Sequence, residues 1–89
     1  MESEKVIERK LVAEVKAAGG WAIKLLATQV TGLPDRMVLL PEGRMFFVEL
    51  KSTGKRPSNI QEFVHEKLRG LGFRVYVIDS KEAAEALLK

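Results

Sequence analysis

Two isolated acids and a lysine lie in the most apolar part of the chain, between residues 32 and 51. Asp35 follows Gly32-Leu33-Pro34 and begins one apolar run, and Glu49 lies near the end of a second run that closes with Lys51. A carboxylate in such a strand has to be paired, hydrogen-bonded or metal-bound, because burying it alone is costly. Side chains alternate along a strand, so Glu49 and Lys51 project from one face, roughly 6.5–7 Å apart. If the two runs pair as a hairpin, Asp35 comes within reach of both, and the three side chains form a candidate magnesium site.

The same side chains also have a purely structural interpretation. Glu49 and Lys51 on an exposed edge strand would form an ion pair that adds little to stability. The residue types and their spacing leave both interpretations open.

Composition sets the class of protein. The 89 residues are 46% apolar and 30% charged, which is typical of one globular domain spanning residues 1–89. The chain has no cysteine, so it contains neither a disulfide framework nor a thiolate metal site. No apolar run approaches the length of about 18 residues that a membrane span needs, and the first residues alternate between charged and apolar. We therefore expect no membrane span and no signal peptide. The net charge of +3 is compatible with nucleic-acid binding but favours it only weakly.

The first predicted helix covers residues 3–18, with Ser3 as its cap and Gly19-Gly20 at its end. At about 100° per residue, one arc of this helix carries Ile7, Leu11, Val12 and Val15. Glu8 falls inside this arc, where an acid costs stability unless something compensates. It is therefore either a carboxylate at the rim of the core or a third acid of the metal site. Glu4, one turn earlier, competes for the latter role.

The rest of the chain is predicted to add four strands and two helices, in the order αβββαβα. The strands are expected over residues 21–28, 35–40, 45–51 and 73–79, with a four-residue hairpin connection at 41–44. The helices are expected to begin at Ser58, which opens a Ser-Asn-Ile-Gln capping box, and at Ser80. This order predicts an α/β fold with a mixed four-stranded sheet flanked by helices. The last two strands would be joined by a parallel, right-handed crossover.

The helix that begins at Ser58 is predicted to pack through its apolar residues, with Gln61 at the margin of the packed face. The expected inner face consists of Ile60, Phe63, Val64, Lys67, Leu68 and Leu71. His65 is the only histidine, and we expect it on the helix surface, so a histidine-based metal site or catalytic triad has little support. Trp21 is expected to be a core or interface aromatic, with stacking on a base as the alternative.

The ordered set of motifs resembles the PD-(D/E)xK nuclease superfamily, and more closely its VRR-NUC branch, the virus-type replication and repair nucleases. Gly32-Leu33-Pro34-Asp35-Arg36 matches the branch's Gly-x-Pro-Asp motif, residues 47–51 match its Glu-x-Lys strand, and Gln61 matches the glutamine that follows. Glu8 corresponds to the glutamate of the family's first helix. The segments around residues 19–21 and 71–75 are also similar. A Glu-x-Lys tripeptide alone says little, but the ordered set covers almost the whole chain and is fairly specific.

The resemblance implies a restriction-endonuclease-like fold and hydrolysis of DNA phosphodiester bonds with Mg²⁺, for which Mn²⁺ can substitute. A hard divalent cation supplies an activated water and offsets charge on the phosphate. The implied ligands are Asp35, Glu49, the Leu50 carbonyl and, through water or a second ion, Glu8.

The resemblance also implies catalytic roles for Lys51 and Gln61, beside Glu8, Asp35 and Glu49. Lys51 would orient the attacking water or hold the scissile phosphate. Gln61 would donate a hydrogen bond to the nucleophile or to the phosphate, or would orient Lys51.

Several basic residues are candidates for contacts with DNA phosphates. Lys55 and Arg56 lie in the loop after the Glu-x-Lys strand, and Lys24 interrupts an otherwise apolar strand. Weaker candidates, with a solvated helix face as the alternative, are Lys5, Arg9 and Lys16.

The expected substrate is structured or branched DNA, such as a four-way junction or a flap, in the cytoplasm of a prokaryote or of a phage-infected host. We expect a homodimer, because one small domain of charge +3 neutralises few phosphates and two copies double that number. Apolar residues that could exceed the capacity of a small core are Trp21, Met37, Met45 and Phe46. Two alternatives remain. One is a nucleic-acid-binding module of the same fold without cleavage, which the complete acid–acid–lysine set disfavours. The other is a structural core whose acids lie at its rim.

Overall fold

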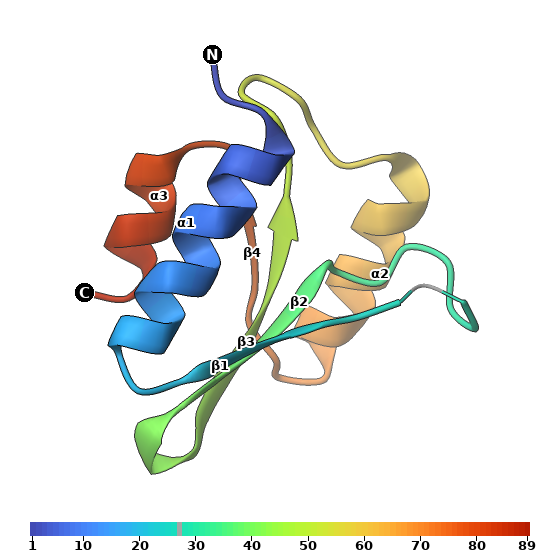
Figure 1. Cartoon of the computed structure of the whole chain (residues 1–89). Coiled ribbons are helices and arrows are strands. Elements are labelled where there is room, and N and C mark those ends of the chain that lie inside the picture. Colours follow the sequence, from blue (N-terminus) through green and yellow to red (C-terminus); the bar gives the residue numbers. More distant parts are fainter. Residues whose placement is uncertain (27) are drawn as a thin grey trace.

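The computed structural model describes residues 1–26 and 28–89. Its elements follow the predicted order αβββαβα (Figure 1). They are α1 (Glu4–Ala17), β1 (Trp21–Lys24), β2 (Arg36–Leu40), the short 3₁₀ turn η1 (Pro41–Gly43), β3 (Arg44–Leu50), α2 (Asn59–Gly70), β4 (Val75–Ile78) and α3 (Lys81–Leu87). Within the described residues, every helix is too short or too polar to cross a bilayer.

The four strands form one mixed sheet in the order β1-β2-β3-β4. The first three are antiparallel neighbours, and β4 runs parallel to β3 after the crossover through α2. Figure 1 shows α1 and α3 together on one side of this sheet and α2 on the other. The predicted mixed four-stranded α/β fold is therefore confirmed.

The apolar core lies between the sheet and the pair α1 and α3. Its buried side chains are Ile7, Leu11, Val15, Val38, Phe46, Val48, Leu50, Ile78 and Ala84. Burying a large apolar side chain of this kind contributes about 1.5–3 kcal/mol. Since alternate residues of β3 face this core, Phe47 and Glu49 lie on the opposite face of the strand, which α2 covers. The core thus fixes the direction in which the acidic residue of β3 points.

Several predicted strand boundaries are wrong. The strand expected to reach Thr28 ends at Lys24, although the Leu25 amide still donates to the Asp35 carbonyl over 2.8 Å. Ala27, inside the predicted strand, lies outside the described residues.

The other strands also differ at their ends. The hairpin connection is shorter than predicted, because Arg44 already belongs to β3 and pairs with Leu40. The strand β3 ends at Leu50, just before Lys51, and β4 covers only Val75–Ile78 of the predicted 73–79.

The predicted inner face of α2 is correct for Val64 and Leu68, which are half-buried, and wrong for Ile60, Phe63, Lys67 and Leu71, which are exposed. Ile60, Phe63 and Leu71 are 48%, 65% and 70% exposed, whereas His65, expected on the surface, is 1% exposed. The face that packs on the sheet consists of Gln61, Val64, His65 and Leu68. These positions follow the spacing i, i+3, i+4 and i+7 of one helix face. The helix is rotated toward its polar residues because it covers the face of β3 that carries Glu49.

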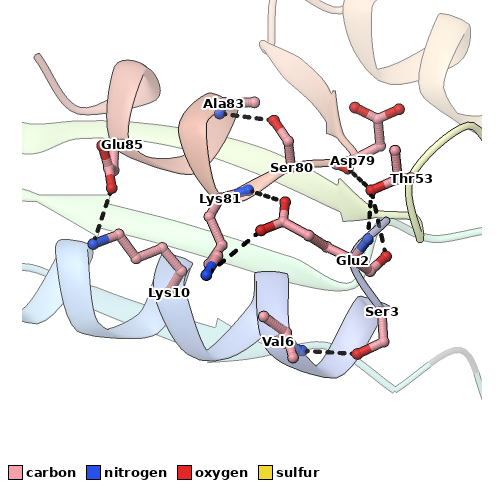
Figure 2. Close-up of polar contacts among 10 residues, drawn as sticks. All are labelled: Glu2, Ser3, Val6, Lys10, Thr53, Asp79, Ser80, Lys81, Ala83 and Glu85. Atoms are coloured by element: carbon pink, nitrogen blue, oxygen red, sulfur yellow. Dashed lines mark hydrogen bonds and ion pairs between the residues drawn. The ribbon is translucent and has the colours of Figure 1, made fainter.

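A polar cluster ties the chain's first residues to the loop that follows β3 (Figure 2). The Glu2 amide donates to Thr53 Oγ1 over 2.9 Å, and the Thr53 amide donates to the Glu2 carbonyl over 3.0 Å. The Glu2 carboxylate accepts the Lys81 amide at 2.9 Å, and the Thr53 hydroxyl donates to the Asp79 carbonyl at 3.0 Å. The loop over residues 52–57 is therefore anchored at its beginning both to the segment that precedes α1 and to the junction of β4 with α3.

Candidate active site

Asp35 and Glu49 are cross-strand neighbours at the open end of the β2–β3 hairpin. Arg36 pairs with Val48 in the antiparallel register, so the preceding Asp35 lies beside Glu49. Asp35 Oδ2 accepts a hydrogen bond of 2.7 Å from the Leu50 amide. The predicted approach of the two acids is therefore confirmed, and a backbone amide holds one oxygen of Asp35.

Gly32 lets the loop before Asp35 lie directly on α2. Its φ of +95° is in the left-handed region, and a Cβ there would lie 2.8 Å from the Ile60 carbonyl oxygen and 3.0 Å from Val64 Cγ2. Only glycine meets both conditions without strain. The Gly-x-Pro segment thus fixes the distance between Asp35 and the first turns of α2.

Glu49 is 1% exposed, and its two oxygens have different surroundings. Oε2 accepts a hydrogen bond of 3.0 Å from Gln61 Nε2 and lies 3.6 Å from Lys51 Nζ. Oε1 has no hydrogen-bond partner, and His65 Nε2 lies 3.5 Å from it. The predicted pairing of Glu49 with Lys51 on one face is confirmed.

The capping box of α2 sets the orientation of Gln61. Gln61 Oε1 accepts the Ser58 amide at 2.9 Å, and Ser58 Oγ accepts the Gln61 amide at 3.3 Å. Because the carbonyl oxygen of the side chain is engaged at the helix N-terminus, its NH₂ group is directed at Glu49. In this structure, Gln61 therefore orients Glu49. Its predicted action on a nucleophile, a phosphate or Lys51 stays a prediction.

The electrostatics of the pair favour a bound cation. Burial and, after it, the charge of Asp35 raise the pKa of Glu49 to about 7, and Lys51 acts in the opposite direction. Burial, together with the charge of Arg69, lowers the pKa of His65. A divalent cation would relieve the repulsion between the two carboxylates and would favour the ionised form of Glu49.

The donor set suits Mg²⁺, which keeps several water ligands, better than a metal ion that is coordinated entirely by protein side chains. Across residues 1–26 and 28–89, no cluster of three or more His, Cys, Asp or Glu side chains is arranged to hold a metal. Two carboxylates completed by water and backbone oxygen are the kind of ligand set that Mg²⁺ accepts. Asp35, Glu49 and the predicted Leu50 carbonyl agree with this chemistry.

Glu8 lies away from this acidic pair. Its Oε2 accepts hydrogen bonds from Arg36 Nε at 3.2 Å and from Nη2 at 3.0 Å. Arg36 also donates from Nη1 to the Ala22 carbonyl over 2.8 Å. Because Arg36 pairs with Val48, it points to the α1 face of the sheet, whereas Glu49 points to the α2 face. A role for Glu8 in metal binding stays a prediction.

The predicted DNA-contacting residues are all on the surface. Lys55 and Arg56 are exposed in the anchored loop, and Lys24 is exposed at the end of the edge strand β1. Lys5, Arg9 and Lys16 are exposed on α1. Their contacts with DNA stay predictions.

Three of the four apolar residues that were expected to exceed the capacity of the core are at least half-buried. Phe46 is buried and Met37 and Met45 are half-buried, so of the four residues named only Trp21 is exposed, at 67%. The expectation of Trp21 in the core is wrong. The exposed apolar residues on α2 and β4 and next to them are Ile60, Phe63, Leu71, Phe73 and Val77.

Sequence reasoning missed the contacts of His65 and of Arg36. His65 lies four residues after Gln61, which puts both on one helix face, and this spacing could have located it. Arg36 lies inside the Gly-x-Pro-Asp-Arg segment, but its bond to Glu8 spans 28 residues, and no local pattern predicts such a contact.

Comparisons with known proteins agree with this geometry. No family model matches the chain. A protein of Acyrthosiphon pisum secondary endosymbiont phage 1, named "Putative nuclease p44", is 42% identical over 84 residues, which are 94% of this chain and 90% of the relative. A solved structure described as a VRR-NUC domain superposes with a TM-score of 0.90 at 30% identity, covering 99% of this chain and 96% of that one.

Proposed function

The chain belongs to the VRR-NUC family of nucleases, and on that basis we propose that it hydrolyses DNA phosphodiester bonds with the help of a divalent cation. The observation that carries the proposal is the mutually repelling pair of half-buried Asp35 and buried Glu49, with Lys51 beside it. A protein that only binds nucleic acid gains nothing from two carboxylates placed near phosphate.

Asp35 and Glu49 would hold Mg²⁺ together with the Leu50 carbonyl, and Mn²⁺ would substitute for it. When bound, the cation would supply an activated water and would offset negative charge on the phosphate. The chain's own part is to keep the two carboxylates in place. The Leu50 amide holds Asp35 Oδ2, and Gln61 holds Glu49 Oε2.

Lys51 would act on the substrate. Its side chain is 17% exposed, so its ammonium group is close to Glu49 and still reaches solvent. In that position, it would hold the scissile phosphate or orient the attacking water, and its charge would stabilise the transition state. Glu8 would contribute through water or a second ion only if its carboxylate left Arg36.

The substrate we propose is structured DNA, either a four-way junction or a flap. Lys55 and Arg56 follow the catalytic strand in a loop whose first residues are anchored, so their charges stay near the site. Together with Lys24, they would neutralise phosphates on either side of the scissile bond.

A second copy of the chain would cover the exposed apolar flank of α2. This flank carries Ile60, Phe63 and Leu71, which lie on one arc of the helix and are 48%, 65% and 70% exposed. Exposed apolar patches mark interaction surfaces. A two-fold homodimer built on this flank would present two sites at a fixed spacing, as a four-way junction requires.

A panel of junction, flap, single-stranded and duplex DNAs tests the proposed activity, with Mg²⁺, Mn²⁺ or a chelator. Asp35→Asn and Glu49→Gln should each lower the cleavage rate at least about a hundredfold, since several kcal/mol of stabilisation are lost. Glu82→Gln, an exposed acid on α3, is the control and should cleave normally. Full activity of either site variant would refute the site. DNA binding by the wild-type protein without any cleavage would favour the non-catalytic binding module.

Equilibrium sedimentation at micromolar concentration, with and without junction DNA, tests the dimer. Phe63→Lys puts a charge on the exposed apolar flank of α2 without touching Glu49, so it should yield monomers. A wild-type protein that is a monomer under both conditions and still cleaves at full rate would refute both the dimer and the symmetric substrate.

A further inference from the structure

Two buried polar atoms face each other behind the acidic pair. They are Glu49 Oε1 and His65 Nε2, at a distance of 3.5 Å, in side chains that are both 1% exposed. Across residues 1–26 and 28–89, they are the buried side-chain nitrogen and oxygen atoms that lack a hydrogen-bond partner. Their shared position makes each the natural partner of the other.

Leaving both atoms unsatisfied would be costly. A buried donor or acceptor without a partner costs about 1–3 kcal/mol, and one hydrogen bond satisfies both. An ionised carboxylate can only accept, whereas a neutral imidazole carries its proton on either ring nitrogen. The distance of 3.5 Å between Nε2 and Oε1 is longer than the usual N–H···O distance of about 2.9–3.0 Å. A small rotation of either side chain would bring the two atoms to that distance.

The helix α2 supplies a partner for each oxygen of Glu49. Gln61 donates to Oε2, and His65, one helical turn later on the same face, lies against Oε1. The capping box fixes the first partner, and burial fixes the second. A carboxylate held at both oxygens by one rigid helix cannot rotate away from Asp35.

We propose that His65 is a positioning residue for Glu49, and that its neutral imidazole, protonated at Nε2, donates a hydrogen bond to Glu49 Oε1. This inference rests on the proposed function, because it assigns a role to a neighbour of the proposed ligand. The competing explanation is that the imidazole only fills space between α2 and the sheet.

Two variants of similar size separate these explanations. His65→Gln places an amide NH₂ within reach of Oε1, whereas His65→Met fills the space without a donor. If His65 positions Glu49, His65→Met should lose 10–100-fold in kcat and in Mn²⁺ affinity, as is typical when a partner of a metal ligand is removed. The KM for DNA should change less than twofold, and His65→Gln should recover most of the loss. Equal activity and Mn²⁺ affinity in His65→Met and the wild-type protein would overturn the proposal, as would equal losses in both variants.

The tautomer of His65 can be read without any cleavage assay. Long-range ¹H–¹⁵N spectra of the wild-type protein at pH 8, with and without Mg²⁺, report which ring nitrogen carries the proton. We expect a protonated Nε2 in both samples. A proton on Nδ1 alone would overturn the inference even if cleavage depends on the metal. A protonated Nε2 in a protein that cleaves no DNA would keep the hydrogen bond while the proposed function fails.

Discussion

The Leu50 amide donates a 2.7 Å hydrogen bond to Asp35 Oδ2, which joins the end of β3 to the residue that precedes β2. The bond holds Asp35 beside the next carboxylate on the neighbouring strand, Glu49. Without a cation, the burial of Glu49 and its repulsion by Asp35 raise the pKa of Glu49. The stability of the metal-free protein should therefore depend on pH in a defined direction.

Raising the pH should destabilise the metal-free protein. The pKa of Glu49 is about 7 in the folded chain, above its ordinary value of 4.5, so the folded chain binds the proton more tightly than the unfolded chain. This stabilisation is complete below about pH 4.5 and is lost as the pH rises through about 7, on the order of 3 kcal/mol in all. Thermal unfolding in the presence of a chelator, from pH 5 to pH 8, measures it.

Glu49→Gln is the control for this pH effect, because the amide has no proton to lose. Its stability should fall much less between pH 5 and pH 8, and Mg²⁺ at pH 8 should restore the wild-type protein but not the variant. Identical pH profiles in the two proteins would show that another group is responsible.

Lys51→Ala should cost turnover more than metal affinity, whereas Glu49→Ala should cost both. An ammonium group does not bind a cation but stabilises charge on the substrate. Calorimetric titration with Mn²⁺, beside single-turnover cleavage, separates the two effects. Lys55→Ala is the control and should weaken DNA binding and reduce its salt dependence without changing the chemical step. A Lys51→Ala protein that binds no Mn²⁺ would mean that Lys51 organises the ligands.

Gly32→Ala should damage the site more than Gly72→Ala does. Both glycines have positive φ, at +95° and +97°, so both variants incur a backbone cost of about 1–2 kcal/mol. Only at Gly32 would the new Cβ also meet a backbone atom, the Ile60 carbonyl oxygen at 2.8 Å, whereas nothing lies within 4 Å of one at Gly72. We expect a lower Tm in both variants and at least a tenfold loss of cleavage only in Gly32→Ala. Equal activity in the two would mean that the loop before Asp35 need not lie on α2.

Glu8→Gln should lower activity and stability more than Glu4→Gln. Glu8 accepts two hydrogen bonds from Arg36, which with its charge are worth about 1–3 kcal/mol, whereas Glu4 is exposed at the start of α1. Cleavage rates and chemical unfolding of the two variants test the order. A larger effect of Glu4→Gln would mean that Glu4, one turn nearer the N-terminus, is the functional acid instead of Glu8.

The sequence predicts the parts of the fold that follow from local periodicity and capping. Ile7, Leu11 and Val15 are buried as their helical spacing predicts, and Ser58 opens a capping box. The pairing of Asp35 with Glu49 follows from strand alternation and one hairpin. The length of β1 did not follow, because side-chain alternation does not show where its backbone pairing with β2 stops.

The packed face of α2 could not be found from hydrophobicity, since this helix covers polar side chains. Apolar content favours Ile60, Phe63 and Leu71 for the interior, and all three are exposed. His65 is buried because its partner Glu49 lies on another element, and a helical pattern carries no information about that partner. The site is thus the part of the fold where apolar patterning fails.

The two faces of the sheet are covered with unequal strength. The helix α1 buries three apolar side chains completely, whereas α2 buries only His65 fully and rests on polar contacts to Glu49. Elements with few buried apolar contacts open locally at lower free energy than the global core. Amide hydrogen exchange should therefore be faster in α2 than in α1. A bound cation that removes the repulsion between Asp35 and Glu49 should slow it, so that exchange in α2 reports the occupancy of the site on the neighbouring strands.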